Sequence, residues 1–419
     1  MSENIIYSFE HSDSIPLKEC DCLSYISRKN SLHLEYIGQE QKIRSSYFIG
    51  IDWIKLHESA LYIEPKLNEK GPETDYIKML FSCLRHADVT VHTKDLYGIN
   101  FDEPFINIDQ KHDMLTPLLV VHFLQVMKII VRKGLKRSFY KVNNNLNARI
   151  KGKINIAQTL KRNVFRNNPL KTFCQYDEFG LNCLENRLLK HTLLFVQKFI
   201  KSDFKETDFN KKCLLPVFNF IFAAFQEVSE NIDIQTIKGF KSNALYKEYD
   251  EAIRLANLIL KRFGYNIKKV SNTEAQNVKV PPFWIDMAKL FELYVLGQLK
   301  DKYANKILYG AKEASGKYGL TDYLLLSDER MIIDAKYKPI YQENRYDIDN
   351  IRQLSGYGRD KGVLSKLGFS KEQMENTVVD CLIIYPDQTV SEKLFENAQK
   401  PIEGFVKFFK KPVKLPQCI

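Results

Sequence analysis

The side chains best suited to chemistry in this sequence are two aspartates and a lysine in its last third. Asp334 and Lys336 lie two residues apart in MIIDAKYK, so on a β-strand they project from the same face. Asp322 begins the preceding strand-like segment, DYLLL. Two carboxylates that meet repel each other unless a cation joins them, and hard oxygen ligands suit Mg²⁺. Lys336 could then orient a metal-bound water and offset negative charge growing on a phosphorus, which predicts magnesium-dependent phosphodiester hydrolysis.

The loop between these two segments decides whether the aspartates meet. The residues SDER, 327–330, are typical of a hairpin turn. A symmetric hairpin centred between residues 328 and 329 would set Asp322 opposite Ala335. An odd-length loop centred on Asp328, or a one-residue bulge, would set Asp322 opposite Asp334. We predict the odd register or the bulge, because either one brings both carboxylates to the Asp334–Lys336 face.

Supporting residues can be proposed on the helices on either side of the strand pair. Glu292 could bind the metal through a water, and the alternative is an exposed ion-pair partner for Lys289. Gln353 and Tyr357 lie four residues apart on a predicted helix, so both can face the site, although an ordinary surface helix explains the spacing equally well. Asp286 is expected to be exposed or to cap its helix.

The elements that must position these residues follow one another in a recognisable order. In the C-terminal part the apolar spacing predicts a helix, a strand pair, a second helix and a strand, in 282–300, 322–326, 331–337, 348–360 and 377–385. Residues 1–66 have the alternation typical of strands. Helical spacing dominates between these parts, in 75–84, 114–133, 183–200, 210–227 and 247–263. The sequence therefore predicts a multidomain α+β protein with a β-rich N-terminal region (1–105), a mostly helical basic middle region (106–275) and a C-terminal α/β domain (276–419).

The net charge of +11 comes from one segment of the middle region. Residues 131–176 contain twelve basic residues and no acidic one, interleaved with Phe139, Tyr140 and Phe165. Such a segment attracts a polyanion through phosphate contacts and counterion release, whereas the alternative is a solvated basic surface. Within it, KGKINIAQTLKRN is typical of a strand or turn that leads into a short helix. The candidate DNA-binding residues are Arg149, Lys151, Lys153, Lys161, Arg162 and Arg166.

Other classes of protein are disfavoured by what the sequence lacks. The longest apolar stretch, 117–131, is interrupted by His122, Gln125 and Lys128, so no membrane span is expected. The start, MSENIIYSFEH, lacks the order of a signal peptide, and we expect a cytoplasmic protein. The eight cysteines and eight histidines show no zinc-site or HExxH spacing. GAKEASGKY, 310–318, has five residues between its glycines and Tyr318 where a phosphate-binding loop has Ser or Thr, so we expect this chain alone to bind no nucleotide.

TDYLLLSDERMIIDAKYK resembles the PD-(D/E)xK nuclease motif in the form found in McrC, the nuclease subunit of McrBC-type modification-dependent restriction systems. The resemblance extends to YFIGIDWIKLHESALYIEPKL, to KGLKRSFYKVNNNL with IKGKINIAQTLKRN, and to YDEFGLNCLENRLLKHTL. It implies a restriction-endonuclease-like C-terminal domain with Asp322, Asp334 and Lys336 as catalytic residues. Thr321 stands where the generic motif has proline, which leaves all metal ligands in place. Nucleases of this type often carry Gln and Tyr at positions like Gln353 and Tyr357.

The same resemblance implies a set of partners and a cofactor. It implies Mg²⁺, for which Mn²⁺ can substitute, double-stranded DNA as substrate, and a separate hexameric AAA+ GTPase, McrB. In that family the N-terminal part of McrC enters the GTPase ring, and residues 1–100 would be the counterpart here. Two alternatives stay open: a non-catalytic activator of an NTPase ring that binds DNA through its basic segment, and a nuclease that works alone.

Overall fold

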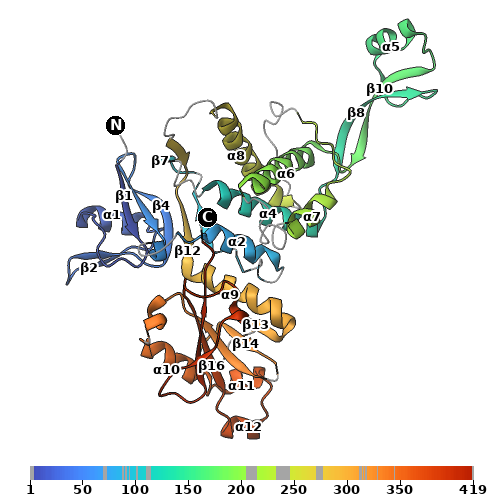
Figure 1. Ribbon diagram of the computed structural model, residues 1–419. Helices are drawn as coiled ribbons and strands as arrows, with labels where there is room; N and C mark the ends of the chain where they lie inside the picture. Colours follow the sequence, from blue (N-terminus) through green and yellow to red (C-terminus); the bar gives the residue numbers. More distant parts are fainter. Residues whose placement is uncertain are drawn as a thin grey trace. The chain divides into compact units, whose positions relative to one another are not determined.

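The protein is described here by a computed structural model (Figure 1). The described residues are 4–68, 73–86, 89, 92–93, 95–100, 102–109, 115–203, 215–232, 246–269, 277–310, 314, 316, 319–327, 329–343 and 345–417. They combine helices with several separate sheets, which confirms the predicted α+β class. Contacts divide the chain into two compact units, one made of residues 1–115 and 275–419 and the other of residues 116–274. Within the described part of the chain, no helix is long and apolar enough to cross a membrane.

The N-terminal sheet of the first unit has five strands in the order β1-β5-β4-β12-β6. Their bounds are β1 (Asn4–Phe9), β4 (Phe48–Lys55), β5 (Ser59–Glu64), β6 (Tyr97–Ile99) and β12 (Phe283–Asp286). Helix α1 (Glu19–Arg28) buries Cys22 and Tyr25 against Leu61 and Ile63 of β5. Smaller elements of this region are the hairpin β2 (Glu35–Ile37) with β3 (Lys42–Arg44), and helix α2 (Tyr76–Arg85). The β-rich character expected for residues 1–66 is therefore present.

Strand β12 joins the N-terminal sheet to the C-terminal part of the chain. The sequence predicted a helix over 282–300, but Phe283–Asp286 pairs with β4 and β6, and helix α9 (Met287–Tyr303) begins only after it. Phe283 and Ile285 alternate into the core as strand residues do, and the Asp286 side chain accepts from the Lys289 N–H, which caps α9. The capping role expected for Asp286 is thus confirmed.

The three regions expected from the sequence are distributed over the two compact units. The second unit, 116–274, lies within the expected middle range of 106–275. Strand β7 (Ile106–Asp109) pairs with β11 (Asn277–Val280), and both belong to the first unit. The expected N-terminal and C-terminal ranges therefore form one unit, because β12 completes a sheet whose other strands come before residue 100.

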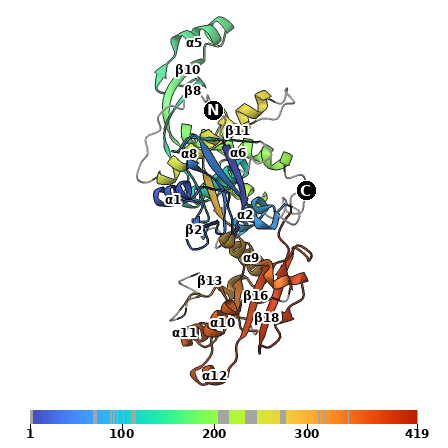
Figure 2. The same cartoon turned by 90° about the vertical axis from the view of Figure 1, so that its left-hand side faces the viewer.

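The C-terminal sheet has six strands in the order β13-β14-β15-β16-β18-β17. Their bounds are β13 (Ile307–Tyr309), β14 (Tyr323–Leu325), β15 (Met331–Ala335), β16 (Asp380–Pro386), β17 (Lys400–Pro401) and β18 (Phe408–Val413). Figure 2 shows β16 and β18, which pair with each other in this sheet. Three helices follow β15: α10 (Ile348–Tyr357), α11 (Lys361–Lys366) and α12 (Lys371–Asn376). On one face, Leu324 and Ile332 pack with Ile351 and Leu354 of α10. On the opposite face the Tyr323 hydroxyl donates to the Glu292 carbonyl of α9 at 2.6 Å.

Among its described residues, the second unit contains four helices outside one long hairpin. The helices are α4 (Leu115–Lys133), α6 (Leu184–Asp203), α7 (Leu215–Ala224) and α8 (Lys247–Lys269). They overlap the expected helices, although residues 114 and 210–214 lie outside the described residues and α7 ends at Ala224, three residues before the expected end. Strands β8 (Ser138–Asn147) and β10 (Lys171–Gly180) pair antiparallel, with β9 (Lys153–Ile154) and helix α5 (Ile156–Arg162) between them in sequence. Figure 1 shows this hairpin extending away from the helices of its unit with α5 at the far end, and we call residues 138–180 the arm.

The arm corrects the expectation of a mostly helical middle region. Its two long strands were not predicted, although β9 followed by α5 matches the strand or turn leading into a short helix expected in KGKINIAQTLKRN. Asn186 of α6 donates to the Lys136 and Leu181 carbonyls at 2.9 and 2.8 Å. These two bonds fix both chain ends at the base of the arm.

Candidate active site

The pairing of β14 with β15 places the two candidate aspartates next to each other. Tyr323 pairs with Ile333 and Leu325 with Met331. Continued by one residue, this register sets Asp322 opposite Asp334 and not opposite Ala335. The predicted odd register is therefore confirmed. Asp322, Asp334 and Lys336 share the face of the sheet that also carries Leu324 and Ile332, because side chains alternate along a strand.

Asp334 and Lys336 form a buried ion pair. Lys336 Nζ lies 2.8 Å from Asp334 Oδ2, and Asp334 is 3% exposed. Asp334 Oδ2 has no well-directed hydrogen bond, so the contact with Lys336 is best described as a charge pair. Burial lowers the pKa of Lys336, but the charges of Asp334 and Asp322 outweigh this effect and raise it above its ordinary value. The lysine is therefore a fixed positive charge at neutral pH.

Asp322 lies in an environment short of positive charge. Its Oδ2 accepts from the Ala335 N–H at 2.8 Å, which ties the carboxylate to β15. Burial raises the pKa of Asp322 well above its usual range, and the charges of Asp334 and Glu292 raise it further. A divalent cation would relieve the burial cost and the repulsion together, so the donor set fits Mg²⁺.

The carboxylates supply few direct ligands. Among the described residues, no group of three or more His, Cys, Asp or Glu side chains is arranged to hold a metal ion. Mg²⁺ keeps several waters and commonly binds through one or two carboxylates, so the pair Asp322 and Asp334 is sufficient in kind. Glu292 does not complete a third direct ligand in this arrangement.

Glu292 forms the ion pair that was considered as the alternative to a metal role. Lys289 Nζ donates to Glu292 Oε1 at 3.2 Å, which is the ion pair given as the alternative. Lys289 Nζ also donates to the Tyr309 hydroxyl at 2.6 Å. The Glu292 charge nevertheless contributes to the raised pKa of Asp322, so it lies close to the carboxylate pair. Tyr309 was not singled out from the sequence, where a tyrosine in an apolar strand gives no signal of this contact.

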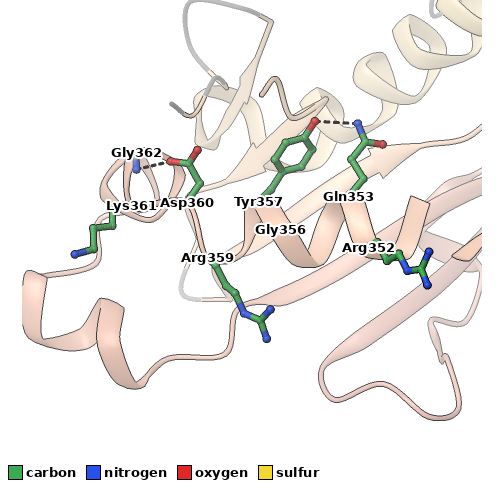
Figure 3. Close-up of a pocket in the computed structure, with 8 residues that line it drawn as sticks. All are labelled: Arg352, Gln353, Gly356, Tyr357, Arg359, Asp360, Lys361 and Gly362. Carbon is green, nitrogen blue, oxygen red and sulfur yellow. Dashed lines mark hydrogen bonds between the residues drawn. The ribbon is translucent and has the colours of Figure 1, made fainter. Parts of the chain in front are cut away.

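Gln353 and Tyr357 contact each other on α10. Gln353 Nε2 donates to the Tyr357 hydroxyl at 2.9 Å, and both residues line a pocket of about 680 Å³ with Arg352 and Arg359 (Figure 3). The lining of this pocket does not include Asp322, Asp334 or Lys336. A Cβ on Gly319 would lie 2.4 Å from Cε1 of Tyr357, so the chain just before Asp322 packs closely on that ring. The helix thus borders the segment that leads into β14.

All six candidate DNA-binding residues lie on the arm and are exposed. Lys151 pairs with Glu178 at 3.1 Å and lies 4.0 Å above the Tyr176 ring, so part of its charge is balanced. Lys161 and Arg162 end α5, and Arg166 ends the short 3-10 helix that follows. Apolar side chains share this surface: Phe139, Phe165 and Phe179 are 73%, 81% and 61% exposed.

Two solved structures from Thermococcus gammatolerans are similar to this chain. One is a half-complex from a tetradecameric assembly of McrB AAA+ hexamers with bound McrC, with 15% identity, a TM-score of 0.38, and coverage of 98% of this chain and 94% of that one. The other is a McrBC complex, with 15% identity, a TM-score of 0.28, and coverage of 71% and 87%. The comparison with curated proteins gives no match.

The family comparison covers most of the sequence. The model of the McrBC 5-methylcytosine restriction system component matches residues 44–359. That range includes β4, the whole second unit, α9, the β14–β15 pair and α10. This chain therefore belongs to the McrBC 5-methylcytosine restriction system component family.

Proposed function

We propose that this chain is the nuclease subunit of a McrBC-like restriction system. In this proposal it hydrolyses DNA phosphodiesters, with Asp322, Asp334 and Lys336 as the catalytic residues. The observation that carries the proposal is the β14–β15 register, which sets two carboxylates opposite each other. A buried ion pair holds the lysine beside them. Family membership supports the restriction system as the setting.

Each residue has a defined role in this proposal. Asp322 and Asp334 would hold Mg²⁺, or Mn²⁺ in its place, and Glu292 would accept a hydrogen bond from a water on the ion. Bound Mg²⁺ supplies Lewis acidity and an activated water. The Lys336 ammonium orients the attacking water and offsets the negative charge that develops on the phosphorus. Gln353 and Tyr357, which contact each other on α10, are supporting residues of the same catalytic site in this proposal.

The test replaces one charge at a time in the full chain assembled with its partner. Lys336→Ala and Asp334→Asn should each lower DNA cleavage by roughly a hundredfold or more, while stimulation of the partner GTPase persists. Asp380→Asn is the matched control, because Asp380 is also a sheet carboxylate 3.5 Å from a lysine, Lys407, but lies at the start of β16. Cleavage that survives both site variants would show that the site is wrongly assigned.

The partner we propose is a McrB-like hexameric AAA+ GTPase. One of the solved structures similar to this chain contains McrB AAA+ hexamers with bound McrC. Two measurements separate this proposal from its alternatives. If the chain is a non-catalytic activator, it should stimulate the GTPase of the partner while the complex of the two proteins cleaves no DNA. If it is a nuclease that works alone, it should cleave DNA equally well with and without the partner and GTP.

The arm is the element that we propose for DNA contact. Its exposed cations suit phosphate binding, and the substitution of Lys161, Arg162 and Arg166 by glutamine should reduce the dependence of DNA affinity on salt concentration. The exposed phenylalanines support a second candidate role, the docking of a protein. Phe165→Ser with the cations intact distinguishes the two, because it should weaken partner binding and leave the salt dependence of DNA binding unchanged.

A further inference from the structure

Three polar side chains join the N-terminal sheet to the segment directly after Lys336. The Tyr337 hydroxyl donates to Glu10 Oε1 at 2.8 Å, and the Lys66 N–H donates to the same oxygen at 3.1 Å. Lys66 Nζ donates to the Tyr337 carbonyl at 2.8 Å. Glu10 follows β1, Lys66 follows β5 and Tyr337 follows β15, so two strands of one sheet contact the end of a strand in the other.

This Glu10–Lys66–Tyr337 cluster contains two buried residues, Glu10 and Tyr337, and the partly buried Lys66. Glu10 is 1% exposed and Tyr337 is 3% exposed. Lys66 Nζ lies 3.9 Å from the centre of the Tyr337 ring and 4.5 Å from that of Tyr47. Burial raises the pKa of the Glu10 carboxyl, although the charge of Lys66 opposes the shift. A buried pair of this kind gains little net stability after desolvation, but its directed bonds favour one arrangement of the groups that it joins.

The cluster acts on the peptide that carries the candidate catalytic lysine. β15 ends at Ala335, so Lys336 lies just beyond the last paired residue of its strand. The Lys336 N–H donates to the Ile384 carbonyl at 2.9 Å, and the carbonyl of the following residue, Tyr337, accepts from Lys66 Nζ. The Tyr337 ring packs against Phe291 of α9 with ring centres 5.7 Å apart. Lys336 and Tyr337 therefore point to opposite faces, and fixing one side chain orients the other.

We propose that Glu10, Lys66 and Tyr337 are positioning residues that hold Lys336 against Asp334, so that the N-terminal sheet sets the geometry of the candidate active site. The inference rests on the proposed nuclease function. Its consequence is that a change at Glu10 or Lys66, which follow strands of the N-terminal sheet, alters cleavage through Tyr337. A displacement of about 1 Å at a reacting group is enough to lower a rate by a hundredfold.

The first test removes one hydroxyl from the full chain in complex with its partner. Tyr337→Phe should lower kcat for DNA cleavage by on the order of tenfold and leave KM for DNA unchanged. Tyr25→Phe is the matched control, because Tyr25 is equally buried and its hydroxyl donates to Asp52 Oδ2 at 2.9 Å within the N-terminal sheet and α1. Equal kcat values in the two variants at equal thermal stability would overturn the proposal.

The second test needs no cleavage. Lys66→Met removes the donor to the Tyr337 carbonyl, and Lys66→Arg retains a donor. In hydrogen exchange followed by mass spectrometry, residues 336–341 should exchange faster in Lys66→Met and at nearly the wild-type rate in Lys66→Arg. Residues 408–413 of β18 serve as the internal reference. Unchanged exchange of residues 336–341 in Lys66→Met would contradict the proposed role of the cluster. A wild-type complex that does not cleave DNA would contradict the proposed nuclease function instead. The exchange comparison would still test the cluster in that case.

Discussion

At the scale of single residues, the candidate site is defined by a shortage of positive charge. Asp322, Asp334 and Glu292 bring three carboxylates near one another, and Lys336 and Lys289 each pair with one of them. Asp322 accepts a hydrogen bond from the Ala335 N–H, and burial followed by the charges of Asp334 and Glu292 raises its pKa. These carboxylates therefore repel one another, and a bound cation would relieve that repulsion.

This repulsion predicts the effect of neutralising Asp322. An acid with a raised pKa in the folded state binds more protons there than in the unfolded chain, so its contribution to stability falls as pH rises above its ordinary value of 3.8. Asp322→Asn should therefore raise the Tm by about 2–4 °C at pH 7 in a chelator. The measurement is thermal unfolding with and without Mg²⁺. Magnesium should stabilise the wild type only, and a lower Tm for the variant in chelator would contradict this account.

The proposed role of Glu292 predicts a change in metal affinity. If it holds a water on the metal, Glu292→Gln should weaken the affinity for Mn²⁺ by about tenfold, as the loss of an outer-shell partner does. Isothermal titration with Mn²⁺ measures this directly. Lys289→Met is the control, because it removes the 3.2 Å contact with Glu292 while the carboxylate remains. Equal affinities in Glu292→Gln and the wild type would leave Glu292 as an ion-pair partner only.

The residues of the site could be predicted from the sequence to the extent that local spacing determines them. Asp334 and Lys336 share a face in any strand, and the short loop limits the position of Asp322 to two registers. Glu10 and Lys66 could not be found in this way, because they reach Tyr337 from more than 250 residues away in sequence. Such contacts depend on how two sheets meet, which no local pattern encodes.

At the scale of elements, one residue, Asp286, both ends strand β12 and caps helix α9. Asp286 closes β12 and accepts from the Lys289 N–H at 2.9 Å. Asp286→Ala should cost about 1 kcal/mol of unfolding free energy, and Asp286→Asn should cost little, because asparagine caps equally well. Urea unfolding of both variants measures the difference. An equal loss in the two would assign the effect to the charge of Asp286 rather than to the cap.

The two elements that the sequence misassigned have different physical causes. FWID was predicted as helix because its apolar residues continue the helical spacing of α9, yet pairing with β4 and β6 on both sides decides its conformation. The arm strands lacked a clear apolar alternation because β8 has few buried residues, with Leu146 as its one fully buried side chain among the residues described. Two strands that pair mainly with each other, away from a core, need no regular alternation of apolar residues, so the sequence gives little indication of them.

At the scale of the whole molecule, the role of the arm can be tested by removing it from the helices of its unit. Phe139 pairs with Phe179, so the chain can be closed there by a short Gly-Ser linker. The helical circular dichroism and the Tm should change little, while DNA affinity should fall about tenfold or more at low salt. Full DNA affinity after removal of the arm would exclude it as the DNA-binding element.

The place of β12 in the N-terminal sheet has a consequence for the order in which the protein forms during synthesis. β1, β4 and β5 leave the ribosome early, but β4 keeps one open edge until residues 283–286 have been translated, more than 200 residues later. An open edge of this kind invites pairing with other chains. A nascent chain that stalls before residue 283 should therefore need a chaperone, and a separately supplied peptide covering β12 should bind at that edge and suppress aggregation.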